Sequence, residues 1–204
     1  MTESIDDKII KKINKAKGGT VFLIDDFLKF GSAKAVGKAL ERLVDTGEIS
    51  RVSRGVYARL KKHPLFGELL PSAEEIAKAI AKKDKARIVP TGVLALNALG
   101  LSTQVPLNLV YLTDGSARTI KIRTQTVKFR KASPRNLSAI GPVSGLVIQA
   151  LKEIGKDQVT EKELRIILQH LKLEDPYRLR HDIKLAPEWI RVIMRKALQT
   201  DNHE

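Results

Sequence analysis

The first part of the chain alternates short helical and β-prone patterns. Residues 5–17 repeat isoleucine at helical spacing, and a stronger helix is predicted over residues 33–45, which Ser32 caps. The side chains expected to be buried on that stronger helix are Val36, Ala39, Leu40, Leu43 and Val44. A short strand and a short helix lie between the two, and two β-prone runs within residues 49–57 flank a glycine turn, which predicts a hairpin.

This order of elements predicts a winged helix-turn-helix domain over residues 1–60. The helix over residues 33–45 carries basic side chains four residues apart, opposite its apolar stripe. Such a helix fits the major groove of DNA, and a basic hairpin beside it would contact the backbone or the minor groove. The predicted DNA-binding residues are Ser32, Lys34, Lys38, Arg42, Arg51 and Arg54. The alternative is a solvated basic face on a small helical bundle.

A second domain is predicted over residues 71–198, after a linker over residues 61–70 that contains Pro and Gly without a periodic pattern. A nearly continuous apolar run over residues 107–112 predicts a buried strand, and a turn at Asp114-Gly115 follows it. Two further runs alternate basic with apolar residues, as strands with one buried face do. Their basic positions are Arg118, Lys121, Arg123, Lys128, Arg130 and Lys131. We expect these side chains either to face RNA, DNA or a toxin, or to protect a sheet edge.

The last third of the chain is predicted to be helical. An apolar stripe runs over residues 143–154, Thr160 begins a capping box, and Pro187 is placed at the start of the last helix. Residues 199–204 are expected to form a flexible tail. The predicted fold class is therefore α+β: a winged helix-turn-helix, then a mixed α/β domain with a small sheet and C-terminal helices.

The charge is concentrated in the first two thirds of the chain. The net charge is +14, with 37 basic and 23 acidic residues. Residues 1–66 carry +6 and residues 67–140 carry +7, whereas residues 141–204 carry only +1. A surplus of this size favours a polyanionic partner, most often nucleic acid.

The composition also excludes several kinds of chemistry. Cysteine is absent, so disulfides, thiolate zinc sites and cysteine nucleophiles are excluded. The four histidines lack metal-ligand spacing, and phosphate-binding loops and dinucleotide fingerprints are missing, so we expect neither a metal nor another cofactor. The strands lack the paired carboxylates of metal-dependent phosphoryl transfer, so we expect no enzyme activity. A nucleic-acid-processing enzyme remains an alternative.

The expected location is the cytoplasm, without membrane contact. The chain opens on acidic and polar residues with no apolar segment behind them, which argues against a signal peptide. No apolar run approaches the roughly 18 residues that a membrane-spanning helix needs.

Three segments resemble the AbiEi-like antitoxins of abortive-infection toxin–antitoxin systems. They are Val-Pro-Thr-Gly at residues 89–92, Ala-Leu-Asn-Ala-Leu-Gly-Leu-Ser-Thr-Gln-Val-Pro at residues 95–106 and Val-Tyr-Leu-Thr-Asp-Gly at residues 110–115. The predicted winged helix and the motif Asp182-x-x-x-Ala186-Pro187-x-Trp189-Ile190 extend the resemblance over most of the chain.

The resemblance implies a transcriptional regulator that is also an antitoxin. In that family the N-terminal domain represses its own operon by binding inverted repeats in the promoter. The remainder opposes a nucleotidyltransferase toxin, without a stable complex in well-known members (type IV). The expected partners are therefore double-stranded promoter DNA and a cognate toxin. The first alternative is a plain winged-helix transcription factor whose second domain dimerises or senses a ligand.

Overall fold

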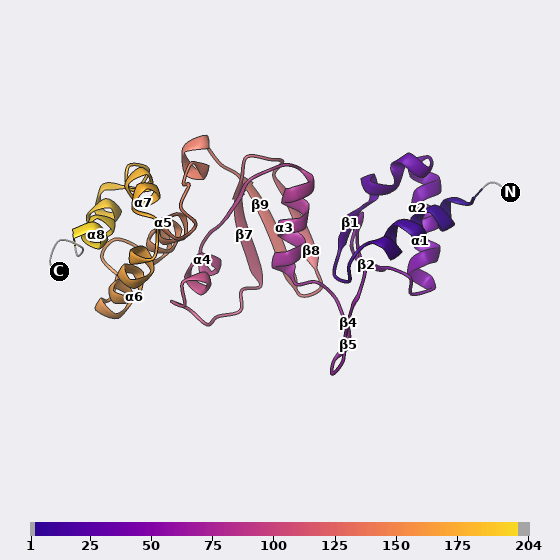
Figure 1. Cartoon of the computed structure of the whole chain (residues 1–204), viewed down its shortest axis with the longest axis horizontal. Helices are drawn as coiled ribbons and strands as arrows, with labels where there is room; N and C mark the ends of the chain where they lie inside the picture. The colour runs from indigo at the N-terminus through magenta and orange to yellow at the C-terminus, as the bar shows by residue number, and fades with distance from the viewer. Residues whose placement is uncertain (1–2, 200–204) are drawn as a thin grey trace. The chain divides into compact units, whose positions relative to one another are not determined.

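The protein has an α+β fold, which confirms the predicted class (Figure 1). The structure is a computed structural model and describes residues 3–199. Its contacts divide the chain into two compact units. The first unit runs to Lys83 and also takes in Ile120–Thr124, and the second comprises Asp84–Thr119 and the chain from Gln125 onward.

The first unit follows the predicted order of helix, strand, short helix, helix and hairpin. Strands β1 and β2 both pair antiparallel with β3, in the order β1-β3-β2. The helices are α1 Ile5–Lys15, the 3-10 helix η1 Ile24–Phe30, α2 Ala33–Asp45 and α3 Ala73–Lys83. The strands are β1 Val21–Leu23, β2 Ser50–Ser53, β3 Val56–Ala58, β4 Lys61–His63 and β5 Gly67–Leu69.

One apolar core holds these elements together. The stripe predicted on α2 is confirmed, since its members are buried apart from a half-buried Val44. Ser32 caps α2 as predicted, because its hydroxyl accepts a hydrogen bond of 3.3 Å from the main-chain N–H of Ala35. The buried core residues are Ile9, Ile13, Phe22, Phe27, Val36, Ala39, Leu40, Leu43, Ile49 and Tyr57. The position of α2 is thus fixed by its apolar side, which leaves its basic side outward.

The segment predicted as a linker, residues 61–70, contains the antiparallel hairpin β4–β5. Helix α3 follows it and groups with the first unit, because it packs against β1. The ammonium of Lys83 at its end contacts Asp26 and lies 5.6 Å from the centroid of the Phe22 ring. The predicted boundary thus lies before α3, whereas the contacts change after it.

The second unit combines most of a four-stranded sheet with a bundle of helices, while the end of β8, from Ile120, groups with the first unit. The strand order is β6-β7-β9-β8, with β6 antiparallel and β9 parallel to β7. The strands are β6 Ile88–Pro90, β7 Asn108–Thr113, β8 Arg118–Ile122 and β9 Gln125–Lys131. The helices are α4 Val93–Ala98, the 3-10 helix η2 Pro134–Leu137, α5 Pro142–Ile154, α6 Glu161–Lys172, α7 Pro176–Ile183 and α8 Glu188–Gln199.

Helix α5 contacts α4, α6 and α7 in the helical bundle, whose apolar core also takes side chains from α8 (Figure 1). Sequence analysis predicted one apolar stripe on α5, yet Ser144 and Gln149 are buried as well. The capping box predicted at Thr160 is confirmed at the start of α6. Helix α7 was not predicted from the sequence.

Two buried carboxylates cap the N-terminus of α5. Asp182 of α7, fully buried, accepts hydrogen bonds from the main-chain N–H groups of Ile140 (3.0 Å) and Gly141 (2.8 Å) and from the Ser144 hydroxyl. The carboxylate of Glu174 accepts the main-chain N–H of Ser144 at 3.1 Å. These N–H groups have no partner within the helix, so the carboxylates satisfy them and favour the positive end of its dipole. Asp182, one of the residues that carry the resemblance, therefore has a structural role.

Within residues 3–199, no helix is long and apolar enough to cross a membrane. Over the same residues, no group of three or more His, Asp or Glu side chains is placed to hold a metal ion. The tail predicted at residues 199–204 lies outside the described residues, except for Gln199 at the end of α8.

Candidate nucleic-acid interface

The N-terminal half of α2 presents two free lysines. Lys34 and Lys38 are exposed and lie one turn apart on the side opposite the core. Neither forms a side-chain hydrogen bond or ion pair with any residue between 3 and 199. Ser32, predicted to contact DNA, is also exposed, with its hydroxyl already engaged in capping the helix. This end of α2 can therefore offer two ammonium groups to an anionic partner.

Arg42, also predicted to contact DNA, has a partner inside the protein. Its guanidinium donates to both carboxylate oxygens of Asp6 on α1, from Nε at 2.9 Å and from Nη2 at 2.8 Å. The hydrogen bond from Arg42 lowers the pKa of Asp6, and the same bond raises the pKa of Arg42. The unbalanced positive charge of α2 is thus concentrated around Lys34 and Lys38.

The surface beside these lysines is built from small side chains. Ser32 and Ala33 are exposed, and Gly37 lies in the interior of the helix. A Cβ atom added at Gly37 would meet no atom within 4 Å. A glycine in a helix interior costs about 0.8–1 kcal/mol relative to alanine, and no steric contact inside the fold requires it here. Sequence analysis missed Gly37, although a glycine within a strong helical pattern was the available signal.

The hairpin β2–β3 carries the remaining predicted DNA contacts, Arg51 and Arg54. Both are exposed, and within the described chain neither forms an ion pair. Gly55 follows Arg54 with φ of +71°, a left-handed conformation that glycine adopts without strain and that turns the hairpin. Arg51 also lines a hollow beside α2, together with Glu41, Val44, Asp45 and Tyr57. The acidic side chains in that hollow confine the basic surface to the N-terminal half of α2 and the hairpin turn.

A second basic strand surface lies on β8 and β9. On β9, Lys128 and Arg130 are exposed while Val127 and Phe129 are buried, as the alternation predicted. On β8, Lys121 is exposed, and the adjoining Ile122 is buried. Exposed cations and buried apolar side chains thus occupy opposite sides of β9.

The other three predicted basic residues are placed differently. Arg118 is half-buried, pairs with Asp84, and lies 5.5 Å from the centroid of the Phe129 ring. Burial lowers the pKa of Arg118. Arg123 is exposed in the turn after β8, with φ of +53°, and Lys131 is exposed at the end of β9. The six residues therefore do not form one continuous face, and Arg118 is held by the protein itself.

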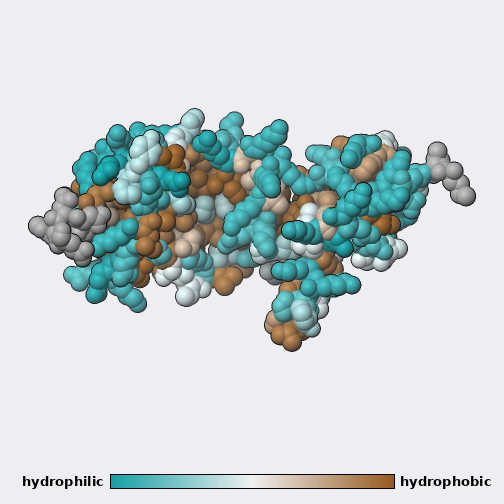
Figure 2. Space-filling model, in the orientation of Figure 1, coloured by the Kyte–Doolittle hydropathy of each residue, from teal (hydrophilic) through white to brown (hydrophobic). Residues whose placement is uncertain are grey.

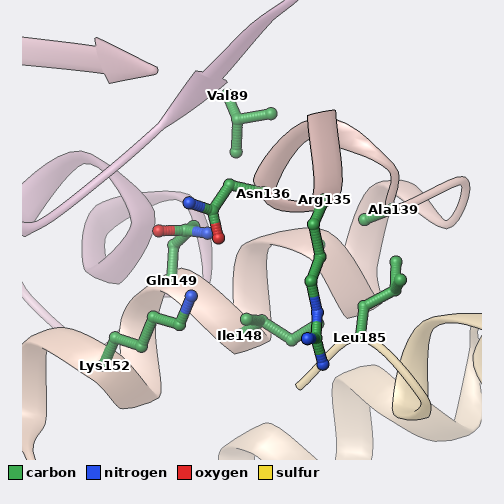
Figure 3. A pocket seen from close by; sticks show the side chains of 9 residues that line it. Val89, Arg135, Asn136, Ala139, Ile148, Gln149, Lys152 and Leu185 are labelled. Carbon is green, nitrogen blue, oxygen red and sulfur yellow. The ribbon is translucent and has the colours of Figure 1, made fainter. Parts of the chain in front are cut away.

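A small hollow between η2 and α5 adds two cations that sequence analysis missed. Its lining includes Arg135 and Asn136 from η2, and Gln149 and Lys152 from α5. Figure 3 shows the ends of Asn136, Gln149 and Lys152 turned toward one another, with Arg135 extending along Ile148. Burial lowers the pKa of Lys152, and the nearby charge of Arg135 lowers it further. The hollow is small, with a cavity volume of about 20 Å3, and it is partly open to solvent. Such a lining suits a small anion.

One known family matches this architecture over most of its length, from within α1 to within α7, residues 8–179. The chain belongs to the family of unknown function DUF6088. No curated protein matches the chain. The region shared with DUF6088 contains α2, the β2–β3 hairpin, the four-stranded sheet and the hollow beside α5. Every candidate contact surface thus lies within the part that defines the family.

Proposed function

We propose that this DUF6088 protein is a DNA-binding transcriptional autoregulator and the antitoxin of a phage-defence toxin–antitoxin operon. It acts by binding rather than by catalysis. The first unit is a winged helix-turn-helix domain that binds double-stranded promoter DNA through α2 and the β2–β3 hairpin. The second unit opposes a nucleotidyltransferase-type toxin.

The observation that carries the DNA-binding proposal is the state of Lys34 and Lys38. Both ammonium groups are exposed on a helix whose opposite side is anchored in the core, and no described residue neutralises them. A rigid helix with free cations and small side chains at one end fits the major groove, where such side chains reach base edges and phosphates. The order of elements and the resemblance to AbiEi-like antitoxins support the same proposal.

The test is promoter binding by Lys34→Ala with Lys38→Ala in the full chain. Each lost base contact should cost about 1–3 kcal/mol, so the double variant should bind the DNA upstream of its own gene at least about ten-fold more weakly. The control removes the same charge from exposed positions of α6, as Lys162→Ala with Lys172→Ala. Equal weakening by both pairs would show that only net charge matters, and α2 would then not be the recognition helix.

For the antitoxin activity, the supporting observation is the exposed pair Lys128 and Arg130 on β9. This surface would shield the nucleic acid on which the toxin acts. The test co-expresses the toxin with the full chain carrying Lys128→Ala and Arg130→Ala, or Lys34→Ala and Lys38→Ala. The β9 variant should lose protection and retain repression, and the α2 variant should do the reverse. Protection by both variants would refute the assignment to β9.

A second candidate is a plain transcription factor whose second unit senses a small anion. The hollow lined by Arg135, Gln149 and Lys152 favours it. In that case no toxin would be neutralised, and an anion would change promoter affinity in a manner abolished by Lys152→Met.

A further inference from the structure

The hairpin β4–β5 ends in an exposed apolar tip. Strand residues pair as Lys61 with Leu69 and His63 with Gly67, which leaves Pro64, Leu65 and Phe66 in the turn. The exposed fraction is 83% for Leu65 and 71% for Phe66. In Figure 2 the end of this hairpin, at the bottom of the view, is coloured as hydrophobic, below a hydrophilic stem. Exposing two large apolar side chains at one point is unfavourable in water, which marks the tip as a contact surface.

The tip has a defined conformation. The main-chain N–H of Leu65 donates to Nδ1 of His63 at 3.2 Å, and the rings of His63 and Phe66 lie 4.9 Å apart. Proline at position 64 further restricts the backbone. Upstream of the hairpin, the guanidinium of Arg59 donates to the main-chain carbonyl of Asn14 at 2.9 Å, which ties its base to α1. A partner would therefore meet side chains that are already ordered, at a small entropic cost.

The charge next to the tip points to a polyanion. Residues 51–66 contain five basic and no acidic side chains. The hairpin itself carries one carboxylate, Glu68 on β5, opposite Lys62, so its two lysines outnumber its acidic residue by one. Lys61 and Lys62, on β4, are exposed, and neither forms an ion pair within residues 3–199. The segment thus combines ammonium groups on a stem with apolar groups at the end. Minor-groove binding proteins use the same combination, since cations contact the phosphates and a Leu, Phe or Pro wedge enters between base pairs.

The size of the tip argues against a second copy of the chain as its partner. A stable protein interface covers about 800 Å2 per partner, whereas a large apolar side chain buries about 150–250 Å2. Two such side chains fall well short of that area. A wedge at one base step, in contrast, needs only one or two side chains, because phosphate contacts supply most of the affinity.

We propose that the β4–β5 hairpin inserts Leu65 and Phe66 at a base step in the minor groove, while Lys61 and Lys62 contact the flanking phosphates. This inference rests on the proposed DNA-binding function and adds a second contact to it. The major-groove contact through α2 selects the site, and the hairpin opens the duplex beside it.

The experiment uses the full chain and promoter fragments that carry 2-aminopurine at successive adenine positions. Binding of the unaltered protein should raise the fluorescence at one base step, because unstacking relieves quenching. Leu65→Ser with Phe66→Ser should abolish that rise and weaken binding about ten-fold or more. Lys61→Ala with Lys62→Ala should weaken binding and flatten its salt dependence by about two units of slope. The matched control, Val105→Ser with Leu107→Ser, changes a comparably exposed apolar pair and should alter neither quantity.

The outcomes separate this proposal from the one on which it rests. If the unaltered protein binds, and the Lys34 and Lys38 variant weakens binding while the tip variant does not, the hairpin proposal alone fails. If the unaltered protein does not bind its promoter, both fail. A tip-dependent change in sedimentation would assign the tip to a second copy of the chain. Tip-dependent binding to phosphatidylserine vesicles with unchanged DNA binding would assign it to a membrane surface. Either of these results would overturn the proposal that Leu65 and Phe66 enter the DNA at a base step.

Discussion

A substitution at Gly37 should change the stability of α2 and its binding to DNA in opposite directions. If a partner approaches the backbone at this position, Gly37→Ala should stabilise the protein and weaken its binding to DNA at the same time. If the fold alone required glycine at this position, the substitution would lower both the stability and the affinity for DNA. The prediction follows from the open space around Gly37, where an added Cβ has no neighbour within 4 Å.

The size of the stabilisation follows from helix propensity. Since the added methyl group meets no atom, the whole difference of about 0.8–1 kcal/mol between glycine and alanine should be gained. Amide exchange of α2 that proceeds through unfolding of the first unit should slow by about four- to five-fold. Gly37→Leu should retain most of this gain, because leucine is also a good helix former. In the major groove of the DNA, the atoms added to the side chain at position 37 would push α2 away from the bases. The promoter affinity should therefore fall about ten-fold for alanine and further for leucine.

Hydrogen exchange is the appropriate assay, because the only tryptophan, Trp189, lies in the second unit and does not report on α2. Promoter affinity is measured by fluorescence anisotropy at one fixed salt concentration. Gln169→Ala, at an exposed position of α6, is the control for a neutral helix-surface change. Faster exchange in Gly37→Ala would mean that an internal contact requires the glycine. Slower exchange with unchanged affinity for both variants would mean that DNA does not approach α2 at Gly37, and the reasoning would be refuted.

Three further predictions concern charged groups. Replacing Arg51 or Arg54 with alanine should weaken promoter and random DNA alike and reduce the salt dependence by about one unit of slope; a loss confined to the promoter would show instead that the hairpin selects bases. Asp6→Asn should release Arg42 and tighten DNA binding at low salt, whereas an unchanged anisotropy titration would place Arg42 outside the interface. Asp182→Asn places an amide donor against donors, so thermal unfolding followed by Trp189 fluorescence should show a loss of about 1–3 kcal/mol; an unchanged midpoint would contradict the capping role.

Local patterns predicted the parts of the fold that depend on neighbouring residues. The buried side of α2, its Ser32 cap and the Thr160 capping box follow from residues within a few positions of one another. The alternation on β9 was predictable for the same reason, since successive side chains of a strand point to opposite faces.

Features that depend on distant partners were not predictable. The turn at Asp114-Gly115 does not determine which strand pairs with β8. In the sheet, β9 lies between β7 and β8, so the two strands that flank the turn are not neighbours. The pairing of Arg42 with Asp6 joins residues 36 positions apart, and it changes which cations of α2 are free. The hollow beside α5 likewise depends on the packing of η2 against that helix. Sequence analysis thus located the basic surfaces, whereas the structure showed which of their charges remain available.

During synthesis, α5 can be capped only after the later residues Glu174 and Asp182 have been made. The carboxylates that satisfy its first turn belong to Glu174 and Asp182, which leave the ribosome well after Gly141 and Ser144. Until they emerge, the nascent α5 begins with bare N–H groups and an uncovered apolar side. A stop codon before Glu174 would therefore leave α5 without the carboxylates that cap it, and we expect cellular proteases to degrade the shortened chain.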